Sequence, residues 1–112
     1  MTELTLNFAR LSYNTYYRIM RNRYVISAKG REFREQVQQA LVGQPKTLGK
    51  FQLEIEFHFK DRRRRDLDNH QKALIDALKD ILFEDDSDVY ELHTKKTIGI
   101  ENKTVIKVEP LN

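Results

Sequence analysis

A short polar segment in the middle of the chain holds the residues best suited to chemistry. Asp66 and Asp68 are two positions apart, so in an extended chain their carboxylates point to the same side. Carboxylates this close repel each other unless a cation or a proton relieves the repulsion. Oxygen ligands in a chain without cysteine suit Mg²⁺, with Mn²⁺ as an alternative, better than zinc. The pair therefore predicts a metal site, while the alternative is a helix cap at Asp68 beside a solvated Asp66.

Basic residues flank this carboxylate pair. Lys72 lies one helical turn after Asp68, where it could stabilise charge on a phosphate under attack. It could equally be an exposed lysine that pairs with Asp68 or Asp76. The run before the pair could grip phosphates through bidentate hydrogen bonds, or could lie on a solvated strand end; it comprises Arg62, Arg63, Arg64 and Arg65.

A second acidic group, Asp85, Asp86 and Asp88, follows about one helix later. It could contribute a further ligand only if the fold returns this segment to the first two aspartates, and otherwise it is an acidic turn. No glycine stands at the position that a calcium loop requires, and no phosphate loop is present. The three histidines lack zinc-site spacing, so we expect structural or surface roles for them.

Alternation and helical spacing predict the elements that position these residues. Apolar residues alternate along residues 51–59, which predicts a strand in the middle of a sheet with its apolar face on the helices. A second helix is expected to start near Asp68, where Gln71 completes a capping signature. The apolar residues of positions 89–108 predict two strands paired as a hairpin.

The N-terminal half is expected to contain a strand, a loop and a helix. Alternation at Leu4, Leu6 and Phe8 predicts a short strand. Residues 12–26 show neither the strand nor the helix period of apolar residues, so we interpret them as a long basic loop. The tyrosines of this loop either anchor packing through their hydroxyls or stack on bases. Ser27 is expected to cap a helix that ends before Gly43 and Pro45.

Composition limits the class of protein. The 112 residues suit one domain, 1–112, and 33% charged residues predict a heavily ionised exterior. The absence of cysteine makes a reducing compartment the simpler assumption. We see neither a signal peptide nor a stretch long enough to cross a membrane, so the cytoplasm is expected. Between positions 10 and 34 only one acid interrupts the basic residues, which indicates a polyanion as partner; these are Arg10, Arg18, Arg21, Arg23, Lys29, Arg31 and Arg34.

Together these residues resemble the RusA family of Holliday-junction resolvases. The central block DRRRRDLDNHQKALIDAL (61–78) followed by EDDSDV (84–89) carries the resemblance, with NTYYR (14–18) and SAKGREFR (27–34) matching more weakly. The resemblance implies an α/β (α+β) single-domain homodimer, with a mixed four- to five-stranded sheet packed by two helices. It assigns the metal to Asp66, Asp68 and Asp86 and the catalytic lysine to Lys72, and it adds Asn14 and Asn69 to the arginines and Lys29 as DNA contacts.

The third ligand rests on the family pattern Asp-Asp-x-x-Val, in which the second acid binds metal. This favours Asp86 and leaves Asp85 or Asp88 as lesser alternatives. The implied activity is Mg²⁺-dependent resolution of four-way junctions in recombination and repair, by paired nicks that leave 5′-phosphate and 3′-hydroxyl ends. The expected setting is a bacterium, with the protein encoded by the host or by a phage. The alternatives are a non-catalytic nucleic-acid-binding module and a nuclease that acts more broadly on flaps and forks.

Overall fold

Strand β4 (Phe51–Phe59) forms the centre of the sheet, as its alternating sequence predicts. Its five apolar residues are buried and the four polar residues between them are half-buried. The computed structural model describes residues 2–7, 17–62 and 67–111. In this structure β4 pairs in parallel with β5 (Val89–Ile98) and antiparallel with β6 (Lys103–Pro110). Strand β1 (Thr2–Leu6) pairs antiparallel with β6, which confirms a mixed sheet of four strands in the order β1-β6-β4-β5.

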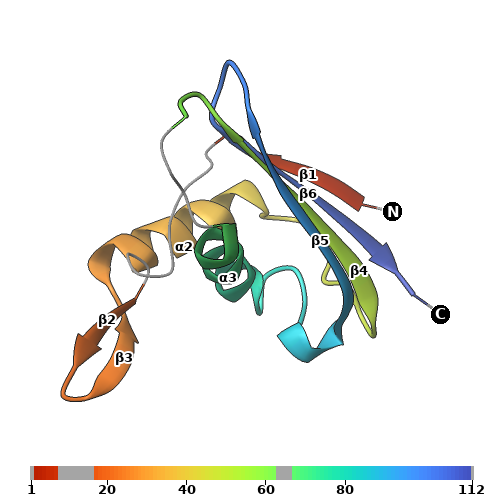
Figure 1. The fold of residues 1–112 in the computed structure, drawn as a ribbon. Coiled ribbons are helices and arrows are strands. Elements are labelled where there is room, and N and C mark those ends of the chain that lie inside the picture. Colours follow the sequence, from red (N-terminus) through yellow and green to blue (C-terminus); the bar gives the residue numbers. More distant parts are fainter. Residues whose placement is uncertain (1, 8–16, 63–66, 112) are drawn as a thin grey trace.

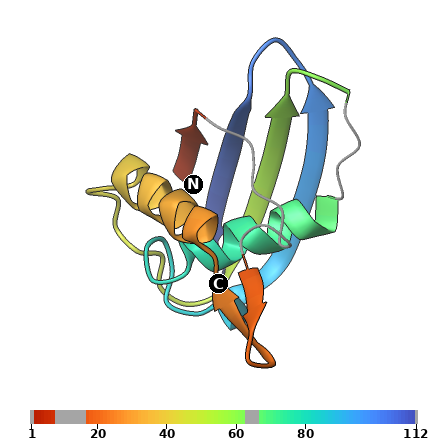
Figure 2. The same ribbon diagram turned by 90° about the vertical axis from the view of Figure 1, so that its left-hand side faces the viewer.

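Two helices, α2 (Ala28–Ala40) and α3 (Leu67–Leu78), cover one face of this sheet (Figures 1 and 2). The Ser27 side chain caps α2 as predicted, because its hydroxyl oxygen accepts a hydrogen bond of 2.9 Å from the Gly30 N–H. Apolar residues of both helices pack on the β4 side chains in a single core cluster. No helix in the described ranges is long and apolar enough to cross a membrane.

The last two strands do not form the predicted hairpin, because β4 lies between them. A parallel partner needs a crossover connection, and α3 provides it by returning the chain from the end of β4 to the start of β5. The turn after β5 then passes over the end of β4. There the Gly99 N–H donates to the Phe59 carbonyl at 2.8 Å, and the Lys60 N–H donates to the Asn102 side-chain oxygen at 3.0 Å.

A β-hairpin replaces the second half of the predicted loop. Strands β2 (Tyr17–Met20) and β3 (Arg23–Ile26) pair antiparallel and project away from the sheet (Figures 1 and 2). Arg21 and Asn22 both have positive φ angles, 51° and 62°, as a two-residue turn between twisted strands requires. Glycine usually marks such a turn in a sequence. The turn was not predicted because Arg21 and Asn22 occupy its two central positions instead. The rest of the expected loop, and Phe8 of the first strand, lie outside the described residues.

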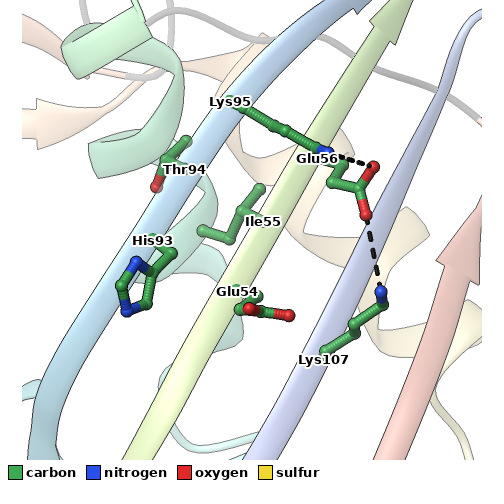
Figure 3. A pocket seen from close by; sticks show the side chains of 7 residues that line it. All are labelled: Glu54, Ile55, Glu56, His93, Thr94, Lys95 and Lys107. Carbon is green, nitrogen blue, oxygen red and sulfur yellow. Dashed lines mark ion pairs between the residues drawn. The ribbon is translucent and has the colours of Figure 1, made fainter.

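The face of the sheet opposite the helices carries a network of charged side chains (Figure 3). Glu56 on β4 lies at its centre, with a side chain that is only 23% exposed. Its carboxylate pairs with Lys95 of β5 at 3.5 Å and Lys107 of β6 at 3.6 Å. These residues line a hollow of about 230 Å³ together with Glu54 and His93. Cross-strand pairs of opposite charge stabilise neighbouring strands, so we assign this network a structural role.

Candidate active site

A cavity of about 530 Å³ brings three of the predicted catalytic residues together. It lies along α3 and the short 3-10 helix η1 (Asp86–Asp88). Of the residues that the structure describes, its lining comprises Asp68, Gln71, Lys72, Ile75, Asp76 and Asp86. Asp68, Lys72 and Asp86 thus share one cavity, although fourteen or more positions separate Asp86 from the other two in the sequence.

The amphipathic pattern of α3 determines which of its residues face the cavity. Residues three and four positions apart share a helix face, which aligns Asp68 with Lys72 and Asp76. The buried side of the helix carries His70, Ala73, Leu74, Ala77 and Leu78. Since Asp68 lies within the first turn of α3 and not before it, the N-cap alternative does not describe its position. Because Asp68 is not the N-cap, Gln71 three residues later does not complete a capping box with it. The Gln71 side-chain oxygen accepts a hydrogen bond from the Thr94 hydroxyl of β5.

In the second acidic group, Asp85 and Asp86 occupy different environments. Asp85 caps η1, and its carboxylate accepts a hydrogen bond of 3.1 Å from the Ser87 N–H. This backbone hydrogen bond is the main reason why the pKa of Asp85 is lowered from its usual value. Asp86 is the residue of this group that lines the cavity. The geometry therefore favours Asp86 over Asp85 as a residue available to a ligand.

Other predicted site residues lie outside the described ranges. These are Asp66, Asn14, Arg10, Arg63, Arg64 and Arg65. Within the described ranges, no group of three acidic or histidine side chains is close enough to hold a metal ion. Asp66, which was predicted as a ligand together with Asp68 and Asp86, is two residues before Asp68 and outside these ranges.

Two of the predicted DNA-contacting arginines in the described ranges form contacts within the chain. Arg34 of α2 forms an ion pair with Asp80 at 3.9 Å, and the Arg31 guanidinium donates to the Ile26 carbonyl at 3.0 Å. The first contact connects the middle of α2 to the segment after α3, and the second lies at the start of α2. The remaining residues of the set are exposed, and they are Arg18, Arg21, Arg23, Lys29 and Arg62. Asn69 is half-buried on α3.

Asp76 and its hydrogen-bond partner Tyr17 were not predicted as part of the site. Asp76 lines the cavity, and its carboxylate accepts a hydrogen bond of 2.8 Å from the Tyr17 hydroxyl of β2. The four-residue spacing of Asp68, Lys72 and Asp76 was a signal that could have indicated Asp76. Tyr17 could not be placed, because the hairpin that carries it was interpreted as a loop. Its hydroxyl anchors packing, which was one of the two alternatives for these tyrosines.

The histidines have the structural and surface positions expected from their spacing. His70 is buried and packs edge-on against Phe57 and Phe59, with ring centroids 6.0 and 5.7 Å away. His58 and His93 lie on the other face of the sheet, beside Glu56 and in the hollow of Figure 3, respectively. None of the three lines the cavity along α3.

Comparisons of the sequence with known proteins show which family it matches. The model of the family Endodeoxyribonuclease RusA matches residues 10–109. A crossover junction endodeoxyribonuclease of Enterobacteria phage 82 is 43% identical over 89 residues, which cover 76% of this chain and 74% of the relative. Proteins of the same name from Shigella sonnei (strain Ss046) and Escherichia coli (strain K12) are 42% and 40% identical, with the same coverage. This chain belongs to the RusA family of endodeoxyribonucleases.

Proposed function

We propose that this chain is a Mg²⁺-dependent endodeoxyribonuclease that resolves Holliday junctions by paired nicks. Its relatives are named crossover junction endodeoxyribonucleases, which favours a nuclease over a non-catalytic binding module. The observation that carries the proposal is the shared cavity of Asp68, Lys72 and Asp86. Two acids and one amine at a concave surface are suited to phosphate chemistry.

The acidic residues of the cavity fit a hard divalent cation. Asp68 and Asp86 offer only carboxylate oxygens, the ligands that Mg²⁺ prefers, and Mn²⁺ accepts the same set. We propose that Asp66 completes the set from the residues just before α3. Bound there, the metal would polarise the scissile phosphate and lower the pKa of an attacking water.

The protein's own residues control how a DNA strand approaches. Without a cation, the carboxylates of Asp68, Asp76 and Asp86 repel a phosphate, so productive binding is coupled to neutralisation of this cavity. Lys72 provides a positive charge on the same face of α3, where it can stabilise negative charge that develops on the phosphate. The hydrogen bond from Tyr17 holds Asp76 in place at the far end of this face.

We further propose a homodimer in which two such cavities cut opposed strands of one junction. A four-way junction has strand symmetry that a twofold pair of sites matches, and resolution needs both cuts. The phosphate contacts that we propose are Asn14, Arg18, Arg21, Arg23, Lys29, Arg31, Arg34, Arg62, Arg63, Arg64, Arg65 and Asn69. We propose that the protein acts in the bacterial cytoplasm and is encoded by the bacterium or by a phage.

Cleavage assays on linear duplex, a fork and a four-way junction test this function. We expect paired nicks in the junction with Mg²⁺, 5′-phosphate ends, and no cutting when the metal is chelated. Equal cutting of forks and junctions would favour a nuclease of broader specificity. Binding of the junction without cutting in Mg²⁺ or Mn²⁺ would contradict the proposal and support a non-catalytic module.

A further inference from the structure

The β2–β3 hairpin has two chemically different faces. Paired residues of an antiparallel hairpin share a face, so the pairs Tyr17 with Ile26 and Ile19 with Tyr24 lie together. Tyr17 and Ile26 pack against the core of the protein. Ile19 and Tyr24 continue this apolar face beyond the core, where they are 68% and 66% exposed. The opposite face carries two arginines among apolar residues, with Arg18 paired to Val25 and Arg23 paired to Met20.

The apolar end of the hairpin is held in a defined place beside the candidate active site. The Tyr17 hydroxyl donates to Asp76, which lines the cavity. The Tyr24 ring packs edge-on against the Tyr17 ring, with centroids 6.5 Å apart. Two aromatic rings and a hydrogen bond therefore connect the exposed Tyr24 to the cavity.

The charge of the hairpin indicates what this exposed face can bind. Residues 17–26 contain Arg18, Arg21 and Arg23 and no acidic residue. An aromatic and aliphatic face flanked by arginines suits a polyanion that also presents flat apolar surfaces, which describes DNA with unstacked bases. Linear duplex keeps its bases stacked in the interior, whereas a branch point provides bases that can be splayed apart.

We propose that this hairpin recognises the branch point of the DNA, an inference that rests on the proposed function. Tyr24 stacks on a base splayed from the centre of the junction, and Ile19 packs beside it. The arginines of the opposite face and the turn hold the flanking phosphates. The hairpin thereby selects branched DNA over linear duplex and places the adjoining strand at the cavity.

The experiment compares junction and duplex affinity by gel shift, with Ca²⁺ replacing Mg²⁺ to prevent cutting. Tyr24→Ser is expected to lower the ratio of junction to duplex affinity by roughly tenfold, because one base-stacking platform is lost. Tyr24→Phe keeps the aromatic ring and should keep the ratio. Ile100→Ser is the matched control, since Ile100 is an apolar residue that is 95% exposed on the turn between β5 and β6.

Photocrosslinking with 5-iodo-2′-deoxyuridine locates the contact directly. A probe at the branch point should crosslink to the peptide that contains Tyr24, and a probe within an arm should not. The inference is overturned if Tyr24→Ser leaves the affinity ratio unchanged, if it weakens both substrates equally, or if arm probes crosslink as well as branch probes. Junction cleavage by the unaltered protein separates these outcomes from failure of the proposed function itself.

Discussion

Individual side chains of α3 have roles set by the helix face on which they lie. His70 and Leu74 point into the core, whereas Lys72 and Asp76, two residues further along in each case, line the cavity. This division follows from helical spacing, so the sequence alone could predict which side of α3 is polar. The approach of Asp86 to Asp68 depends on the path of the chain between α3 and β5. No local pattern encodes that distance, which is why the sequence left three candidates for the third ligand.

Lys72→Met tests the role of the amine in the cavity. We expect the cleavage rate to fall by roughly 100- to 1,000-fold, as when one preorganised charge-stabilising donor is removed. Stability should change by less than about 0.5 kcal/mol, because Lys72 is exposed. Single-turnover cleavage measures the first effect and urea denaturation the second. Lys79→Met, an exposed lysine just after α3, is the control and should cut like the unaltered protein.

At the scale of the elements, local pattern and long-range pairing differ in how well the sequence predicts them. The alternation of β4 and the cap of α2 are local features, and both were predicted correctly. The pairing of β5 and β6 with β4 is not local. Two apolar stretches close in sequence resemble a hairpin, and only the crossover through α3 shows that β4 separates them. The β2–β3 turn was missed because Arg21 adopts a positive-φ conformation that is usually taken by glycine, asparagine or aspartate.

Tyr17→Phe tests how firmly the β2–β3 hairpin is attached to α3. The substitution removes the hydroxyl that donates to Asp76 and keeps the ring. We expect the free energy of unfolding to fall by about 1 kcal/mol, the usual net contribution of such a hydrogen bond. Urea denaturation measures it, with Tyr90→Phe as control because Tyr90 is largely exposed on β5. Equal stability of both variants would show that the hydrogen bond does not hold the hairpin.

At the scale of the whole molecule, the account requires a basic surface that follows the DNA backbone. Replacing two arginines of the run at positions 62–65 with alanine should weaken DNA binding and reduce its dependence on salt. Each lost phosphate contact lowers the slope of log affinity against log salt by roughly 0.9 on duplex DNA, so a decrease of about 1.8 is expected. Filter binding at several salt concentrations measures it. An unchanged slope would mean that the run is a solvated surface.

The account also requires two copies of the chain for paired cutting. A domain of 112 residues offers little surface to hold a four-way junction alone. We expect light scattering at micromolar concentration to give twice the mass of 13.4 kDa. A monomer that resolves junctions with full activity would contradict the dimer without contradicting the cavity.

Strand scission of a four-way junction by four aspartate variants tests the central claim most directly. Asp66→Asn, Asp68→Asn and Asp86→Asn should each abolish cutting in Mg²⁺ while binding the junction as tightly as the unaltered protein or more tightly. Each substitution removes a proposed metal ligand and also a charge that repels the phosphate backbone. Asp85→Asn should cut normally, because asparagine can also accept the Ser87 N–H at the start of η1. If Asp85→Asn is inactive while Asp86→Asn cuts, the third ligand is wrong, and if all four variants cut normally, the site itself is wrong.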